Sequence, residues 1–150
     1  MATTQELEQL DCKYDKIVEK RYGQAWFVPE YYALVCELTD SYVPIEKFKE
    51  IFKEMQQQVE GKDVKRFVFD KRNLRVFHQP SMEWYFIEWK KEMYDKGVVE
   101  HRKILPDGED WFKQAVKAGR ELIKEKYPDN IIHKLNIVYC SSIEEALKGK

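Results

Sequence analysis

Apolar and polar positions along the chain follow two different periods, and these predict strands and helices in alternation. Short segments are apolar or alternate apolar and polar residues, and longer ones repeat apolar residues every three or four positions. Strands are predicted at 16–22, 26–38, 65–70, 98–105 and 135–139. Helices are predicted at 44–60, 81–95, 109–126 and 142–147. Such alternation requires crossovers that place helices on a shared sheet. We therefore expect an α/β fold with a mixed four- to five-stranded sheet and about four flanking helices.

Local signals refine this pattern. Pro29 and Glu30 can divide the extended region 26–38 into a hairpin. The apolar run at 67–69 indicates a strand buried on both faces. Small residues at 115, 118 and 119 would let the helix at 109–126 approach the sheet closely. Residues Ser142 to Glu145 match a capping box, which predicts the start of a short terminal helix.

The helix at 81–95 carries more large apolar side chains than a single inner stripe can bury. They are Met82, Trp84, Tyr85, Phe86, Ile87, Trp89, Met93 and Tyr94. Core packing accounts for part of this set. We expect the remainder, with Trp84, Tyr85 and Trp89 as candidates, to face a partner or a ligand, and a homodimer is the simplest use of such a face.

Length, charge and cysteine content narrow the class of protein. The 150 residues fit one domain, and residues 1–12 are predicted to be a frayed or locally helical leader. The 26 basic and 27 acidic residues give a net charge of −1, so no overall field attracts nucleic acid or an anionic membrane. Three widely spaced cysteines fit no disulfide framework and no CxxC motif, which favours a reducing compartment. With no signal peptide and no apolar run long enough to span a membrane, we expect a cytoplasmic location.

Four stretches of the sequence resemble the SpoIIAA-like, or STAS-like, domain family. They are residues 44–48 after an early strand, the RFVFDKRNL segment, the helix start near Ser81, and the strand and capped helix at 137–147. Together they cover most of residues 14–147. The resemblance implies a four- or five-stranded sheet with helices, in a fold similar to CRAL-TRIO-like lipid-binding domains. It also implies a non-enzymatic role in protein–protein signalling or ligand sensing. In such proteins a phosphorylatable serine begins the helix after the central strand; Ser81 corresponds to it, although HQPSMEW replaces the usual Asp-Ser-Ser-Gly-like sequence.

A basic loop before the helix at 81–95 is the strongest candidate for a binding site. Arg72, Arg75 and His78 follow Lys71 and lead to Ser81, which can cap the helix. Free amide groups at a helix start, joined by Arg side chains, suit a phosphate or carboxylate. The alternative is a solvated basic loop with an ordinary serine cap.

No catalytic or cofactor motif stands out. The sequence contains no GxGxxG, P-loop or GxSxG pattern, and its three histidines share no metal-ligand spacing, so neither a cofactor nor a metal is expected. Our first hypothesis is therefore a STAS-like regulatory or interaction module that binds a protein partner, a second copy of itself or a small anion through residues 71–89. The alternatives are a small-molecule or lipid-like carrier with an apolar cavity beneath the aromatic helix and, third, an enzyme with a dispersed site.

Overall fold

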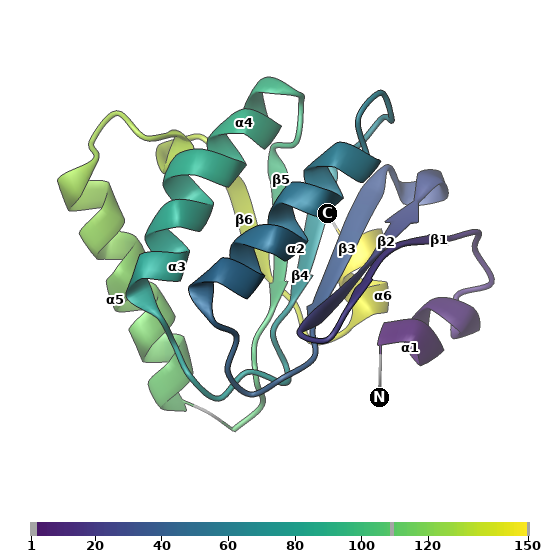
Figure 1. Cartoon of the computed structure of the whole chain (residues 1–150), viewed down its shortest axis with the longest axis horizontal. Helices are drawn as coiled ribbons and strands as arrows, with labels where there is room; N and C mark the ends of the chain where they lie inside the picture. Colours follow the sequence, from purple (N-terminus) through teal and green to yellow (C-terminus); the bar gives the residue numbers. More distant parts are fainter. Residues whose placement is uncertain (1–2, 109, 150) are drawn as a thin grey trace.

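The computed structural model describes residues 3–108 and 110–149, which form a six-stranded mixed sheet between two layers of helices (Figure 1). The strands are β1 (Asp15–Lys20), β2 (Gly23–Val28), β3 (Ala33–Leu38), β4 (Arg66–Asp70), β5 (Glu100–Ile104) and β6 (Asn136–Tyr139). The α/β class is confirmed, but the expected four to five strands are corrected to six. The additional strand arises because the 3-10 turn Pro29–Tyr31, followed by Tyr32 in the left-handed region, divides 26–38 into β2 and β3.

Strand order follows chain order, β1-β2-β3-β4-β5-β6. The pairs β1–β2 and β2–β3 are antiparallel, while β3, β4, β5 and β6 are parallel. Crossovers between parallel strands are almost always right-handed. Because the order runs in one direction, right-handed crossovers place all the connecting helices on the same face of the sheet.

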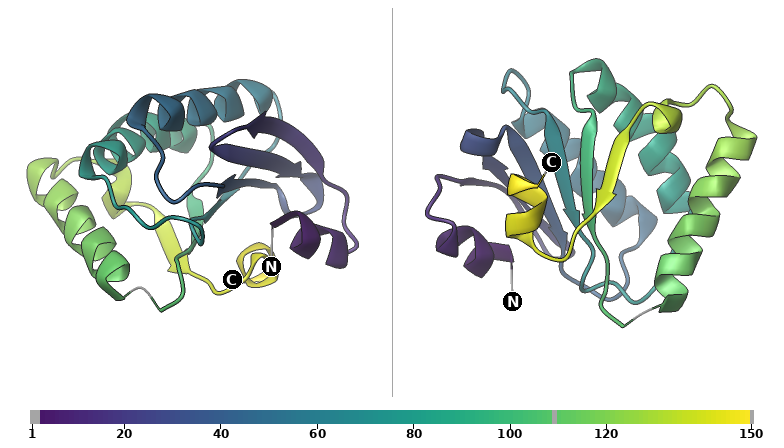
Figure 2. Two further views of the ribbon diagram at one scale, coloured as in Figure 1. Left: turned by 60° about the horizontal axis from the view of Figure 1, so that its bottom comes forward. Right: turned by 180° about the vertical axis from the view of Figure 1, so that it is seen from behind.

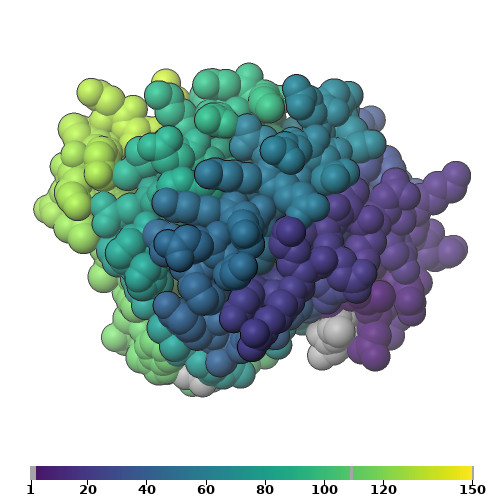
Figure 3. All heavy atoms as spheres, in the orientation of Figure 1, coloured from purple at the N-terminus to yellow at the C-terminus, as the bar shows by residue number. Residues whose placement is uncertain are grey.

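The helices accordingly divide unequally between the two faces (Figure 2). One face carries α2 (Ile45–Gln58), α5 (Asp110–Lys126) and a long helix made of α3 (Gln79–Trp84), the π-helical turn η2 (Tyr85–Trp89) and α4 (Lys90–Asp95). The opposite face carries the terminal helices α1 (Thr3–Gln9) and α6 (Ile143–Lys148). Figure 3 shows the first of these surfaces, with α2 across its centre.

Several helix starts differ from the sequence expectation. Residues 3–9 of the leader, which was expected to be frayed or locally helical, form helix α1 with Leu7 fully buried; residues 1–2 lie outside the described residues. Glu109, the predicted start of α5, also lies outside the described residues. The helix after β4 begins at Gln79, with His78 at the cap position, so Ser81 is in the first turn and is not the N-cap.

The core has two halves, one on each face of the sheet. In β4, Phe67 and Phe69 pack toward α2 and η2, while Val68 packs toward α6, as the period of two in a strand requires. All three side chains are buried, which confirms the prediction for this strand. Gly119 on α5 allows close packing, but against Phe77, Gln79 and Met82 rather than against the sheet.

The π-helical turn explains how the aromatic helix buries so much bulk. A π-turn contains an extra residue, which changes the direction of the side chains that follow it. Tyr85, Phe86 and Trp89 are all buried, and the Trp89 indole Nε1 donates to the Phe52 carbonyl at 2.9 Å. Within the described residues, no helix combines the length and apolar character that crossing a membrane requires.

Candidate functional site

A cavity of about 60 Å³ lies at the carboxyl ends of β3, β4 and β5, beneath the start of α3. This is the edge where open α/β sheets commonly bind ligands. Of the lining residues, Leu38 ends β3, Lys71 follows β4, and Lys103 lies near the end of β5. The lining is mostly apolar and aromatic, consisting of Leu38, Tyr42, Val43, Phe48, Phe69, Lys71, Leu74, Val76, Phe77, His78, Ser81, Met82, Tyr85, Lys103 and Phe112.

Three buried lysines gather at this cavity, each against aromatic rings. Lys71 and Lys103 line it, and Lys90 lies behind Tyr85 and Phe86. The Lys90 Nζ lies 3.9 Å from the Phe86 ring centre and the Lys103 Nζ lies 4.7 Å from the same ring. The Lys71 Nζ lies 5.0 Å from the Phe69 ring centre. Aromatic faces attract cations, but much more weakly than a carboxylate would.

These amines lack acidic partners. Within residues 3–108 and 110–149, the buried Nζ atoms of Lys90 and Lys103 and the Tyr85 hydroxyl have no hydrogen-bonding partner. Among those same residues, no Asp or Glu lines the cavity. A buried polar group without a partner is costly, and a buried charge is more costly still.

The pKa values of the lysines reflect this environment. Burial, assisted by the charge of Arg120, lowers the pKa of Lys71 to about 7. Burial also lowers the pKa of Lys103 well below its usual value, and the positive charges of Lys90 and Lys71 act in the same direction. The pKa of Lys90 is lowered well below its usual value for the same reasons. Burial therefore disfavours the charged forms of Lys90 and Lys103, while Lys71, with a pKa of about 7, is partly charged at neutral pH.

Two of the four residues predicted to bind an anion line this cavity. Ser81 is buried with its Oγ 2.9 Å from the Nδ1 of His78, and both residues contribute to the wall beside Lys71. Arg72 and Arg75 are not part of the lining. The Arg75 guanidinium donates to the carbonyls of Arg72 and Leu74, at 2.8 and 2.7 Å, which holds the loop in shape.

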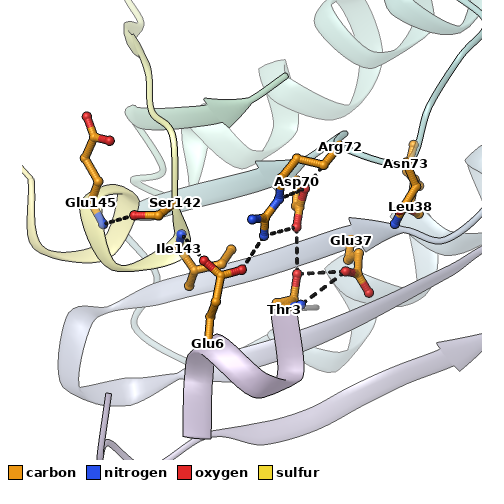
Figure 4. Close-up of polar contacts among 10 residues, drawn as sticks. All are labelled: Thr3, Glu6, Glu37, Leu38, Asp70, Arg72, Asn73, Ser142, Ile143 and Glu145. Carbon is orange, nitrogen blue, oxygen red and sulfur yellow. Dashed lines mark hydrogen bonds and ion pairs between the residues drawn. The ribbon is translucent and has the colours of Figure 1, made fainter. Parts of the chain in front are cut away.

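Arg72 instead turns to the opposite face of the sheet, where it joins the terminal helices to β4 (Figure 4). Its Nε and Nη2 donate to the two carboxylate oxygens of Asp70 at 3.0 and 2.8 Å, and Nη2 also donates to Glu6 of α1. Burial opposes the charge of Arg72, but the hydrogen bonds to Asp70 and Glu6 prevail and raise the pKa of the guanidinium above its usual value. The role that the structure gives Arg72 is therefore structural.

The same network fixes both terminal helices. Thr3 at the start of α1 places its Oγ 2.7 Å from Asp70 and 3.0 Å from Glu37. The second oxygen of Glu6 accepts from the backbone N–H of Ile143, at the start of α6, at 3.1 Å. The Ser142 Oγ caps α6 by accepting from the Glu145 N–H at 3.1 Å, which confirms the predicted cap.

The three aromatic residues proposed as a partner or ligand face have different positions. Tyr85 lines the cavity, Trp89 is buried in the core, and Trp84 is half-buried against Phe48 with the Lys49 ammonium over its ring. Of these three, the structure thus brings Tyr85 to the same site as His78 and Ser81.

Sequence reasoning missed Lys90 and Lys103 and treated Lys71 as part of an exposed loop. A signal for Lys103 was present: His101, Arg102 and Lys103 occupy the middle of a predicted strand between apolar residues. Strands in parallel sheets are buried on both faces, so polar residues at such positions point to a special role. No comparable signal marks Lys90, because its burial depends on the π-helical turn just before it.

Neither a metal-binding cluster nor similarity to known proteins assigns a function to this cavity. In the described ranges, no three His, Cys, Asp or Glu side chains lie close enough together to hold a metal ion. The chain matches no protein-family model, and neither the curated proteins nor the solved structures contain a significant match to it.

Proposed function

We propose that the domain is a ligand-binding module that takes a small anion into the cavity between Lys71, Lys103 and Tyr85. The observation that supports this most directly is the buried Lys103 amine, which is 1% exposed and has no hydrogen-bonding partner in the described part of the chain. An anion would supply the missing acceptor and the missing negative charge together.

The energetics favour an occupant of opposite charge. The charges that lower these pKa values are all positive: Arg120 acts on all three lysines, Lys71 acts on Lys90 and Lys103, and Lys90 acts on Lys103. A bound anion would reverse this and be held by charge-assisted hydrogen bonds in a site of low dielectric constant. His78 and Ser81 would complete its polar contacts at the wall.

The size of the cavity limits the ligand. One water requires about 10–15 Å³ on this scale, so about 60 Å³ holds a few waters or one small anion. Pockets for larger organic ligands start at about 300 Å³. A sulfate, a phosphate or a short carboxylic acid fits this space, and a lipid-like molecule would require the cavity to open.

A thermal-shift titration with sulfate tests the proposal, with sodium chloride at matched ionic strength as the reference. At a sulfate concentration of about one hundred times Kd, we expect about 2.7 kcal/mol of stabilisation, and each kcal/mol raises Tm by about 2–4 °C. Lys103→Met and Lys71→Met should each abolish most of this sulfate-specific shift. The matched control Lys53→Met changes an exposed lysine on α2 and should retain it. An equal shift in all variants would show that sulfate does not bind in the cavity.

A STAS-like regulatory role is our second proposal, because ligand sensing is among the roles that the sequence resemblance implies. Tyr42 and Val76 support this proposal, because both line the cavity and are 46% and 45% exposed. The Val76 N–H donates to the carbonyl of Ser41, next to Tyr42, at 3.2 Å, so the two segments that carry these side chains are held together. A protein partner or second copy that contacts these side chains would sense whether the cavity is filled. Sedimentation velocity of the wild type and of Tyr42→Ser/Val76→Ser, with and without sulfate, tests the homodimer: a mass that sulfate does not change in either protein would contradict it.

A further inference from the structure

The two lysines in the cavity are suited to different tasks, and their arrangement extends the proposed anion binding to covalent chemistry. We propose that the Lys103 amine captures the carbonyl carbon of a small 2-oxo acid as an imine, while Lys71 holds the carboxylate of the same molecule. This inference rests on the proposed function, because it uses the same cavity and the same anionic group.

Strand register places the two amines on one face of the sheet. Phe69 of β4 is the register partner of Lys103 on the adjacent parallel strand β5. Lys71 follows Phe69 by two residues, and both line the cavity together with Lys103. A carboxylate at Lys71 would thus bring a carbonyl on the neighbouring carbon toward Lys103, as the short separation of these groups in a 2-oxo acid requires.

The surroundings favour the reactive, uncharged form of Lys103. An amine must be unprotonated to attack a carbonyl, and burial beside other cations is an established way to achieve this at neutral pH. Lys90 and Lys103 lie over the same Phe86 ring, and the charge of Lys90 lowers the pKa of Lys103. Lys71 has a pKa of about 7, so it retains part of its charge and can attract the carboxylate.

The chemical step balances without an external oxidant or reductant. The nitrogen of Lys103 bonds to the carbonyl carbon, and the electron pair of the C=O bond moves to the oxygen. One amine proton then passes to this oxygen to give a carbinolamine. The second amine proton leaves with the hydroxyl group as water, and the nitrogen forms a double bond to carbon. Tyr85 lines the cavity, and its buried hydroxyl, which has no partner in the described chain, can donate a hydrogen bond to the departing oxygen.

Reductive trapping tests this step on the full chain. The protein is incubated with glyoxylate and sodium cyanoborohydride at about pH 7, and the product is analysed by intact mass and peptide mapping. We expect one reduced glyoxylate adduct, located on Lys103 and prevented by excess sulfate. Lys103→Met should lose this adduct, and Lys103→Arg, which keeps a positive charge but no nucleophilic amine, should lose it as well. Lys71→Met should slow trapping by about tenfold, since it removes one charge-assisted contact. Acetaldehyde, which has no carboxylate, should react slowly with the wild type and the Lys71→Met variant alike.

The outcomes separate this inference from anion binding. Sulfate stabilisation without any adduct on Lys103 would overturn the carbonyl chemistry and leave the anion site intact. Neither stabilisation nor adduct would overturn both. Labelling spread over surface lysines, or confined to Lys71, would overturn the assignment to Lys103. Circular dichroism of each variant establishes that it is folded before its labelling is compared.

Discussion

At the scale of single residues, the unusual feature is a cluster of amines that the fold buries without placing an acidic side chain beside them. His101 belongs to this cluster too, since it lies two residues before Lys103 on the same face of β5 and has no hydrogen-bonding partner for either ring nitrogen among the described residues. Burial, followed by the charges of Lys90 and Lys103, lowers the pKa of His101 well below its usual value. Burial thus disfavours the charged forms of four basic groups in the interior, and a cost of this kind is typical of functional sites.

Replacing Lys103 with methionine should stabilise the empty protein. The substitution removes a buried donor that has no partner in the described chain and keeps a side chain of similar length. We expect the free energy of unfolding to increase by about 1–3 kcal/mol in urea denaturation. The exposed-site control Lys53→Met should change it by less than about 0.5 kcal/mol. A destabilised Lys103→Met would show that the amine is satisfied by a contact within the chain.

The stability of the wild type should rise with pH between about pH 7 and 8.5. Lys71 has a pKa of about 7 when folded and near 10.4 when unfolded, so in this window the unfolded chain binds more protons. The free energy of unfolding then increases with pH, by about 1.4 kcal/mol per pH unit for each proton of difference. Burial raises the pKa of the Cys36 thiol, and this lowers stability as pH rises. The effect begins only above about pH 8.5, where the thiol ionises in the unfolded chain.

Urea denaturation of the wild type and Lys71→Met across this window measures the effect. The variant should show a smaller slope of stability against pH, because it lacks one of the titrating lysines. Parallel curves for the two proteins would mean that Lys71 titrates normally in the folded state.

At the scale of elements, the sequence predicted most of the strands and helices but not how their ends meet. Periodicity located β4, β5, β6, α2 and α5 to within a few residues, because each has a regular apolar pattern. It failed at the helix after β4, where His78 and not Ser81 occupies the N-cap position, and where the π-helical turn changes which side chains point inward. The candidate site was the part predicted least well. Its residues come from the ends of three strands and from one helix, and the directions of their side chains depend on tertiary packing.

The network centred on Arg72 is the clearest case of a side chain whose role depends on tertiary structure. The sequence shows a basic loop, whereas the structure shows an ion pair with the buried Asp70 and a link to Glu6. No local pattern relates Arg72 to α1, because the two segments are far apart in the chain.

Replacing Arg72 with methionine should loosen both terminal helices without affecting the cavity. The substitution leaves Asp70, which is 1% exposed, without its ion-pair partner, and breaking such a buried pair costs about 3–5 kcal/mol. Hydrogen exchange should accelerate in α1 and at the start of α6, where Glu6 accepts from Ile143. Sulfate should still stabilise the variant by the wild-type amount. Loss of the sulfate response with unchanged exchange in α1 would instead place the anion at Arg72.

At the scale of the whole molecule, strand order follows chain order, and this places the basic cluster and the acidic network on opposite faces of the sheet. The crossover helices cover the face where Lys90, His101 and Lys103 lie, and the terminal helices cover the face where Arg72 contacts Glu6 and Asp70 (Figures 2 and 4). The sheet lies between the acidic and the basic groups. No Asp or Glu among the described residues lines the cavity, so when its lysines are protonated a counter-charge would come from a bound anion, which is the physical basis of the proposed site.

Binding of sulfate should consequently be coupled to uptake of protons. An anion beside Lys71 favours its charged form and raises its pKa above about 7, so at about pH 8 the complex holds a proton that most free molecules lack. Isothermal titration calorimetry in buffers of different ionisation enthalpy measures this uptake, since the observed heat varies with the buffer in proportion to the protons bound. We expect an uptake approaching one proton per sulfate for the wild type, and much less for Lys71→Met if residual binding is measurable. Sulfate keeps a constant charge in this range, so the protons come from the protein. Binding without proton uptake would mean that the anion meets lysines that are already charged, and the argument from uncompensated burial would fail.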